Sequence, residues 1–205
     1  MIEAFSLATA HLFQDALASQ ARLRYNVFVR QRGLAHSFFD SLEFDEFDTP
    51  SAVYLVWRDS ERVVRGLSRL LRTDRPYMLA SYWPHLVENG DLPCSDAVWE
   101  ITRLCTAPAK DIEPRLIRRR LATAMCEFGL LYGINRYTCV THVQYLSNLL
   151  AVGWECELLG EPRQVDRDVV GALSISISPA TLQLFREKLG SRTPVLQLDA
   201  FAAAA

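Results

Sequence analysis

Hydrophobic spacing along the chain predicts an alternation of helices and strands. In the first part, apolar residues recur every three or four positions over 9–33, which predicts a helix capped by Thr9 and ended by Gly33. The next apolar runs, 51–57 and 63–71, are rich in β-branched and aromatic residues and are joined by a short charged turn. They therefore predict an antiparallel hairpin.

The rest of the chain continues this alternation. Pro114 marks the start of a long amphipathic helix, and Gly133 marks its end. Residues 169–178 alternate apolar and polar side chains, which is typical of a strand with one buried face. Gly66, inside the second hairpin strand, predicts a bulge or the close approach of another backbone. The other expected elements are an edge strand at 1–7, strands at 97–105, 137–143 and 154–159, and helices at 144–151 and 179–189.

The order of these elements predicts the fold class. Mixed helices and strands with an early hairpin indicate an α/β (α+β) fold, a three-layer α-β-α sandwich around a mixed, mostly antiparallel sheet. A chain of 205 residues without repeats or linkers is expected to form one domain over 1–205. The alanine-rich tail at 200–205 is expected to fray.

Composition narrows the class of protein. Half of the residues are apolar and 22% are charged, as in ordinary globular proteins, and the net charge of -2 argues against a nucleic-acid partner. The chain contains no apolar run of membrane-spanning length. No secretory leader is expected, because Glu3 and the lack of a basic segment do not fit one. Five widely spaced cysteines without a Cys-x-x-Cys pair are typical of reduced thiols, and the four histidines have no metal-ligand spacing. We therefore expect a cytoplasmic protein with no metal centre.

An acidic stretch at 41–50 stands out from this background. It places four carboxylates within six residues and two phenylalanines between them: Glu43, Asp45, Glu46 and Asp48, with Phe44 and Phe47. A helix would suffer from such neighbouring like charges, so we expect an irregular loop. In one interpretation the aromatic residues anchor the loop to a core while carboxylates face a site. In the other interpretation it is an ordinary surface loop, and the two phenylalanines only attach it to the protein.

Charged residues also interrupt two expected strands. Glu100 and Arg103 lie in an otherwise apolar strand, and Arg69 lies in the hairpin. Three positions apart on a regular strand, Glu100 and Arg103 would point to opposite faces, so a joint role requires a β-bulge. An edge-strand salt bridge is the alternative.

A basic run opens the helix that begins at Pro114. Arginines at a helix N-terminus oppose the macrodipole unless an anion binds there. Arg115, Arg118 and Arg119 would suit a phosphate, a phosphopantetheine group or an acidic carrier protein. The alternative is a solvated basic face.

Several of these residues form an ordered set of short motifs: Leu23-Arg24-x-x-Val27-Phe28-Val29, Glu43-x-Asp45-x-x-Asp48, Arg69-Leu-Leu, Pro76-Tyr-Met-Leu79 and Val98-Trp-Glu-Ile-Thr-Arg103. In order and spacing this set resembles the acyl-homoserine-lactone synthases, the LuxI-type autoinducer synthases. The resemblance covers roughly the N-terminal half, and it continues more loosely through Val140-Thr141 and Gly153-Trp154.

The resemblance implies a fold related to the GCN5-type N-acetyltransferases, and it also implies a reaction. The amine of S-adenosylmethionine attacks an acyl thioester carried by coenzyme A or by acyl carrier protein. The methionine carboxylate then closes onto its own γ-carbon, which expels methylthioadenosine and leaves an acyl-homoserine lactone, a quorum-sensing autoinducer. Both molecules are substrates, so no cofactor is expected.

The resemblance also assigns residues to roles. Glu100 is the candidate base, or the group that orients a water acting as base. The expected S-adenosylmethionine site comprises Arg24, Phe28, Leu34, Glu43, Asp45, Asp48, Arg69 and Arg103. The expected acyl pocket comprises Met78, Trp83, Thr141, Tyr145, Leu146 and Leu149, with Arg115, Arg118 and Arg119 at the thioester carrier. Phe28 and the five pocket residues other than Thr141 are equally compatible with an ordinary core.

Two positions depart from the family pattern. Leu34 stands where a tryptophan is usual, and Trp83 stands where a phenylalanine is common. These changes permit a branched or aryl acyl-CoA as donor. Two alternatives to a synthase remain: a GCN5-related N-acyltransferase acting on another amine, and a non-catalytic relative that binds one of these ligands as a sensor.

Overall fold

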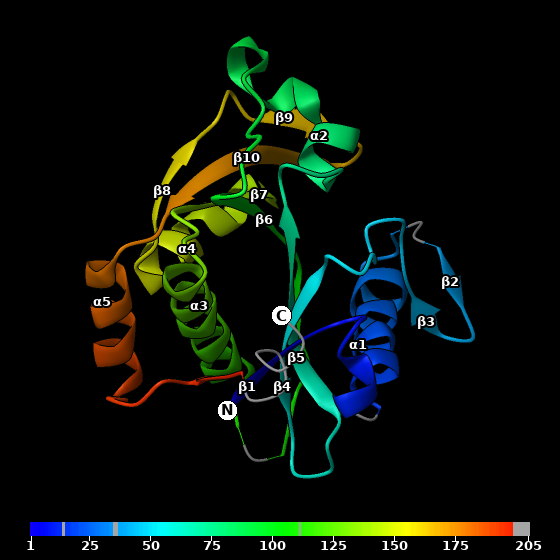
Figure 1. The fold of residues 1–205 in the computed structure, drawn as a ribbon. Coiled ribbons are helices and arrows are strands. Elements are labelled where there is room, and N and C mark those ends of the chain that lie inside the picture. Colours follow the sequence, from blue (N-terminus) through cyan, green and yellow to red (C-terminus); the bar gives the residue numbers. More distant parts are fainter. Residues whose placement is uncertain (14, 35–36, 111, 199–205) are drawn as a thin grey trace. The chain divides into compact units, whose positions relative to one another are not determined.

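The computed structural model describes residues 1–13, 15–34, 37–110 and 112–198 (Figure 1). The chain forms two compact units. Unit 1 comprises Met1–Leu70, Arg103–Met125 and Thr193–Ala205, and unit 2 comprises Leu71–Thr102 and Cys126–Arg192. The tail expected to fray at 200–205 lies outside the described residues, and a single domain over 1–205 stays a prediction.

The strands of unit 1 include the predicted hairpin. Strand β4 (Val53–Arg58) pairs antiparallel with β5 (Val64–Arg72), as expected. Strand β1 (Ile2–Ser6) lies between β4 and the short parallel strand β11 (Leu196–Gln197). The prediction of an edge strand at the N-terminus was therefore wrong, because two residues near the C-terminus cover that edge.

The predicted first helix is divided into three helical segments. A 3₁₀ turn, η1 (Ala10–Phe13), precedes α1 (Ala16–Arg24), and the chain then widens into the π-helix η2 (Tyr25–Gln31). Thr9 does not cap α1, because its hydroxyl accepts the backbone N–H of Ser6 at 2.9 Å. Gly33 ends the helical run in the left-handed conformation that favours glycine, with φ +67°, as predicted. π-helical turns occur frequently at functional sites.

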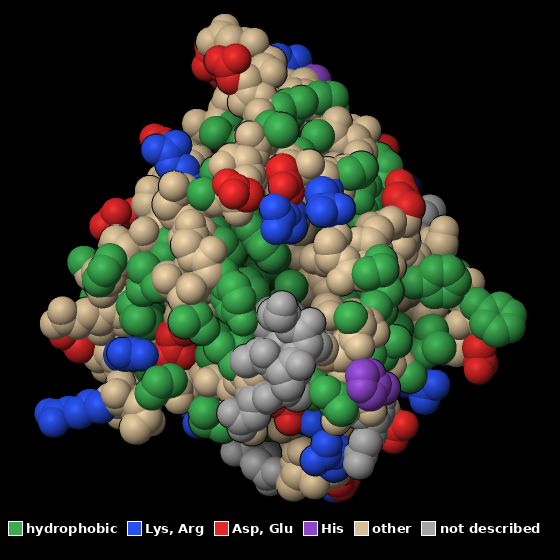
Figure 2. All heavy atoms as spheres, in the orientation of Figure 1, with side chains coloured by type: hydrophobic (Ala, Val, Ile, Leu, Met, Phe, Trp, Pro, Cys, Tyr) green, Lys and Arg blue, Asp and Glu red, His purple; other side chains and the backbone are tan. Residues whose placement is uncertain are grey.

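A two-stranded hairpin follows the π-helix. Strands β2 (Phe38–Phe39) and β3 (Leu42–Glu43) lie beside α1 (Figure 1). Phe38 and Phe39 are exposed, and hydrophobic side chains project from this region at the right edge of Figure 2. Strand β3 lies inside the acidic stretch 41–50, so the expectation of an irregular loop was wrong for Leu42 and Glu43, which pair with β2, and is confirmed for 44–50, which we call the acidic loop.

Gly66 lies at the expected bulge, whereas the segment that approaches it does so through a side chain and not through its backbone. The register of β4 and β5 shifts between Trp57 and Arg58, opposite this glycine, and a Cβ at Gly66 would overlap the Cγ2 of Ile117. Ile117 belongs to α3 (Pro114–Leu131), the predicted long helix. The missing side chain thus lets α3 lie close against β5.

We expect Gly66→Ala to lower the free energy of unfolding by about 1–3 kcal/mol, because the added methyl group overpacks the β5–α3 contact. In an Ile117→Ala background the clash is absent, and the same substitution should then cost little. Urea unfolding of the four proteins in this cycle measures the coupling. An equal cost in both backgrounds would contradict the proposed contact.

Unit 2 contains the remaining strands. The first part of β6 (Val98–Thr106) pairs parallel with β7 (Arg136–His142), and β7 pairs antiparallel with β10 (Asp168–Ser176). Strands β8 (Glu155–Leu158) and β9 (Arg163–Val165) pair with the other edge of β10. Because β10 is an interior strand with both faces covered, consecutive residues 172–175 are buried and the half-buried pattern expected there was wrong.

Short and longer helices complete unit 2. Helix α5 (Pro179–Leu189) has the predicted bounds, and α4 (Leu146–Val152) ends at Gly153 as expected. The connection between β5 and β6 contains α2 (Met78–Tyr82) and the 3₁₀ turns η3 (Pro84–Leu86) and η4 (Glu88–Gly90), and η5 (Val143–Tyr145) precedes α4. None of the described helices has both the length and the apolar character needed to cross a membrane.

Candidate functional site

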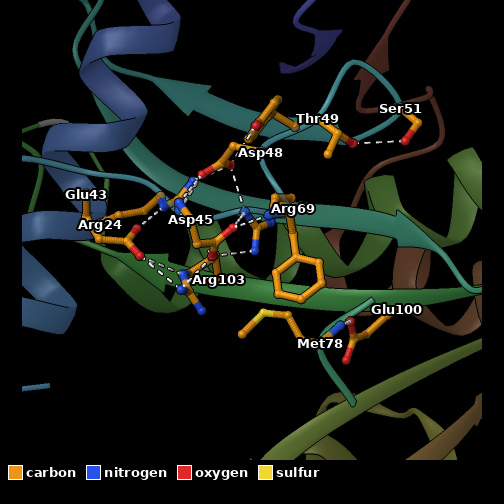
Figure 3. Close-up of polar contacts among 12 residues, drawn as sticks. Arg24, Glu43, Asp45, Asp48, Thr49, Ser51, Arg69, Met78, Glu100 and Arg103 are labelled. Atoms are coloured by element: carbon orange, nitrogen blue, oxygen red, sulfur yellow. Dashed lines mark hydrogen bonds and ion pairs between the residues drawn. The ribbon is translucent and has the colours of Figure 1, made fainter. Parts of the chain in front are cut away.

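Six charged side chains from distant parts of the sequence gather within unit 1 (Figure 3). They come from the end of α1, from β3, from the acidic loop, from β5 and from β6: Arg24, Glu43, Asp45, Asp48, Arg69 and Arg103. We call these six residues the charged cluster. The sequence resemblance predicted each member, and the structure brings all six together.

Arg24 holds two carboxylates of the cluster. Its two terminal nitrogens donate to the two carboxylate oxygens of Asp48 at 2.7 and 2.9 Å, and its Nε donates to Glu43. The side chains of Arg24 and Glu43 are fully buried. A planar guanidinium suits this double recognition, because its donors form a fixed fork.

Arg69 shapes the acidic loop from the opposite strand. It donates to both oxygens of Asp45 at 2.6 and 2.9 Å and to Asp48 at 2.7 Å. The carboxylates in turn accept backbone N–H groups of the loop, from Asp45 to Asp48 at 2.8 Å and from Phe47 to Asp45 at 2.9 Å. The loop conformation therefore depends on the arginines that neutralise it.

The two phenylalanines of the loop differ in their surroundings. Phe47 is buried and anchors the loop as predicted, whereas Phe44 is half exposed. Glu43 points inward at the end of β3, and side chains of successive strand residues point to opposite faces. Because Phe44 is 48% exposed, the expectation that both aromatic residues are anchors was wrong for Phe44.

Arg103 reaches the cluster from an irregular point of β6. Its φ is +53°, a left-handed conformation that costs a non-glycine residue about 1–3 kcal/mol. Its guanidinium donates to Glu43 at 2.9 Å and to Asp45 at 2.7 Å. We expected an irregular backbone between Glu100 and Arg103 if the two residues act together. The positive φ of Arg103 is such a departure from regular strand geometry.

Burial and charge act against each other in the pKa values of the cluster. Burial alone would raise the pKa of Asp48, but the hydrogen bond from Arg24 and the charges of Arg69 and Arg24 hold it well below its ordinary value. Burial alone would lower the pKa of Arg24, and its carboxylate partners raise it instead. Arg24 and Asp48 are therefore both ionised at neutral pH and hold each other in the charged form.

Tyr54 is a member of this site that we did not predict. Its hydroxyl donates to Asp48 at 2.7 Å, and burial raises the pKa of its phenol. Tyr54 lies directly opposite Arg69 in the β4–β5 pair. This cross-strand pairing could have identified Tyr54, because neighbouring side chains on paired strands interact. Here the Tyr54 hydroxyl and the Arg69 guanidinium both donate to Asp48.

Phe28 and Leu34 occupy different positions beside the cluster. Phe28 is buried in the π-helix, and the guanidinium carbons of Arg32 and Arg103 lie 5.3 and 5.5 Å from its ring centroid. This packing favours a position beneath the cluster. Leu34 is exposed just after Gly33. Contact of either residue with S-adenosylmethionine stays a prediction.

Glu100 lies in unit 2 and is almost fully buried. Its two carboxylate oxygens accept the backbone N–H groups of Met78 and Leu79, each at 2.8 Å, at the start of α2 (Figure 3). The N-cap residue of this helix, Tyr77, makes no side-chain capping bond. Glu100 thus caps α2 from a neighbouring strand, an interaction typically worth about 1 kcal/mol. Its role as a base stays a prediction.

The six residues expected to line an acyl pocket lie on three segments of unit 2. Met78 is buried in α2. Trp83 is half buried, and the centroid of its ring lies 5.5 Å from that of Tyr82 with the two ring planes at 73°. Thr141 is half buried near the end of β7. Tyr145 is exposed, whereas Leu146 and Leu149 are half buried in α4. That they line one pocket stays a prediction.

The arginines at the start of α3 are exposed. Arg115 forms an ion pair with Glu113 at 2.5 Å, and Arg118 donates to the hydroxyl of Thr106 at 3.0 Å. Arg119 is exposed on the same turn. These contacts are compatible with a solvated basic face, and a role in carrier binding stays a prediction. Within the described ranges, no group of three or more His, Cys, Asp or Glu side chains could hold a metal ion.

Comparison with known proteins now identifies the family. The model of the autoinducer synthase family matches residues 10–184. The isovaleryl-homoserine lactone synthase of Bradyrhizobium diazoefficiens is 30% identical over 211 residues, which cover 100% of this chain and 94% of that protein.

Solved structures agree with this match. A CoA-dependent acyl-homoserine lactone synthase with SAM and isopentyl-CoA superposes with a TM-score of 0.89 at 28% identity, covering 100% of this chain and 98% of the other. A putative N-acetyltransferase from Lactobacillus plantarum, with a TM-score of 0.57 at 19% identity, covers 86% of this chain and 99% of its own, and shows the fold alone. The predicted fold class, a mixed sheet with helices on both sides that resembles the GCN5-related transferases, is confirmed. The chain belongs to the autoinducer synthase family.

Proposed function

We infer that this chain is an acyl-homoserine-lactone synthase. It transfers an acyl group from a thioester to the amine of S-adenosylmethionine, and the product then lactonises with release of methylthioadenosine. The observation that carries this function is the charged cluster, whose six residues occupy the positions of the family motifs and form one hydrogen-bonded network. A purely structural core would not need three arginines and three carboxylates in one network.

The members of the cluster divide by exposure into two groups. Arg24, Glu43 and Arg69 are fully buried and hold the loop, whereas the side chains of Asp45, Asp48 and Arg103 are 11%, 14% and 9% exposed. The second group is available to a substrate. In our proposal the carboxylates bind the ammonium and sulfonium of S-adenosylmethionine, and Arg103 binds its carboxylate as a fork.

The reaction also requires the amine to lose a proton, since a free α-amino group has a pKa of roughly 8. Glu100 orients a water that removes this proton, or removes it directly. Most of the rate comes from holding amine and thioester together, which replaces a bimolecular encounter. No resident cofactor takes part in this scheme.

The acyl donor in our proposal is an acyl-CoA. The similarity to a CoA-dependent synthase over the whole chain supports this carrier, and the isovaleryl-homoserine lactone synthase supports a short branched acyl group. Leu34 and Trp83, which depart from the usual family residues, fit a donor other than an unbranched chain on acyl carrier protein. The five free cysteines fit a reducing cytoplasmic location.

Incubation of the protein with S-adenosylmethionine and a panel of acyl-CoA and acyl-carrier-protein thioesters tests the function. We expect free thiol and methylthioadenosine to form one for one with at least one branched acyl-CoA, and mass spectrometry to detect the lactone. Thiol release without methylthioadenosine would instead indicate an N-acyltransferase for another amine. Binding measured by calorimetry without turnover would indicate a sensor.

The Asp45→Asn variant tests the placement of S-adenosylmethionine in the same assay. It should raise the KM for S-adenosylmethionine about 10- to 100-fold, because a hydrogen bond between charged groups is lost, and leave the KM for the thioester unchanged. An equal rise in both constants would count against this placement.

A further inference from the structure

The chain between β5 and β6 is held at two points within unit 2. The first is Glu100, whose carboxylate accepts the N–H groups of Met78 and Leu79. The second is the turn after β8, where the N–H of Glu88 donates to the carbonyl of Leu159 at 2.8 Å. Residues 78–88 thus span two fixed ends, and we call this stretch the α2 segment.

Gly160 shows how closely the second end is packed. A Cβ at Gly160 would lie 2.7 Å from the carbonyl oxygen of Leu86 and 2.9 Å from the nitrogen of Glu88. Both of these atoms belong to the backbone, which cannot move aside as a flexible side chain would. This end of the α2 segment is therefore fixed by backbone contact.

Backbone hydrogen bonds also order the α2 segment between its two ends. The N–H of Trp83 donates to the carbonyl of Leu79 at 3.0 Å, and the N–H of Leu86 donates to the carbonyl of Trp83 at 3.0 Å. Because Met78 and Leu79 are buried, the N-terminal end has no freedom to re-pack without disturbing the core. Hydrogen bonds thus link Glu100 to Leu79 and Leu79 to Trp83.

We propose that Glu100 is a positioning residue for the acyl donor: by capping α2 it fixes Met78 and Trp83 and so sets which acyl groups are accepted. This proposal rests on the proposed function, because it places Met78 and Trp83 at the acyl group. It assigns Glu100 a role in donor selectivity that is separate from any role in proton transfer. The two roles predict different effects of the same substitution.

The test compares two acyl-CoA donors that differ in size, each at saturating S-adenosylmethionine. In Glu100→Gln one carboxylate oxygen becomes an N–H₂ group, which faces the N–H donors of α2 instead of accepting from them. We expect the ratio of kcat/KM between the donors to change by about tenfold, similar to the discrimination that one methylene provides in a pocket. A role limited to proton transfer lowers kcat for both donors equally and leaves the ratio unchanged.

Glu127→Gln is the matched control. Glu127 is also a buried carboxylate of unit 2, but it lies in α3 and accepts from Arg186 of α5 at 2.8 Å. This variant should keep the donor ratio of the unmodified protein. Met78→Ala should shift the ratio on its own, and combining it with Glu100→Gln should add little, because both act through the same side chain.

Amide hydrogen exchange gives a readout that does not depend on turnover. The amides of Met78 and Leu79 should exchange faster in Glu100→Gln than in the unmodified protein, and should be unaffected in Glu127→Gln. If Glu100→Gln does not fold, Glu100→Asp can replace it, because aspartate withdraws the carboxylate by one methylene. Glu100→Asp should likewise change the donor ratio of kcat/KM and speed the exchange of the Met78 and Leu79 amides. An unchanged donor ratio together with unchanged exchange would overturn the proposal. Failure of the proposed function would appear differently, as the absence of methylthioadenosine with the unmodified protein.

Discussion

Arg24→Ala is expected to lower the free energy of unfolding by about 3–5 kcal/mol, the usual cost of breaking a buried ion pair by removing one of its members. The substitution removes the guanidinium that bonds Glu43 and both oxygens of Asp48. Glu43 is fully buried, so water cannot replace the lost bonds without opening the fold. Urea unfolding followed by circular dichroism measures this change.

Arg30→Ala provides a matched control within the same helical run. Arg30 is exposed, and its guanidinium donates to Asn26 at 3.3 Å, so its removal should cost no more than about 0.5 kcal/mol. Arg24→Lys should give an intermediate loss, because an ammonium keeps the charge but not the fork. The description of the cluster would be wrong if Arg24→Ala and Arg30→Ala were equally stable.

The charged cluster also shows what the sequence could predict. Four carboxylates within six residues marked the loop, and the resemblance to a family added the arginines at positions 24, 69 and 103. Composition and periodicity alone could not have joined these arginines to the loop, because contacts between distant segments leave no local pattern. Tyr54 was missed for the same reason, since its contact with Asp48 depends on the register of two strands.

The errors in the fold have comparable causes. Periodicity predicted α5 and the β4–β5 hairpin because each buries one face over its whole length. It missed β11, which has only two residues and forms solely by pairing with β1. It also could not separate α1 from the π-helix that follows, because both place apolar residues at similar spacing. Short and irregular elements depend on their partners more than on their own composition.

Acid should destabilise this protein strongly through the same cluster. In the folded state the pKa of Asp48 lies well below its value of about 3.9 in an unfolded chain, despite burial, because Arg24, Arg69 and Tyr54 stabilise the ionised form. This contribution is fully present above about pH 4 and is lost as the pH falls towards the folded-state pKa. Each proton taken up on unfolding changes the free energy of unfolding by up to about 1.4 kcal/mol per pH unit.

Asp48→Asn isolates this effect, because an amide does not titrate. Urea unfolding between pH 5 and 2 (about three pH units) should show an acid limb that is shallower by up to about 1.4 kcal/mol per pH unit than in the unmodified protein. Tyr54→Phe removes only the hydrogen bond to Asp48. Between pH 5 and 2 (about three pH units) its free energy of unfolding should therefore fall by more than that of Asp48→Asn and by less than that of the unmodified protein. Parallel acid limbs for Asp48→Asn and the unmodified protein would mean that Asp48 does not carry the acid sensitivity, and that the arginines stabilise the loop by some other contact.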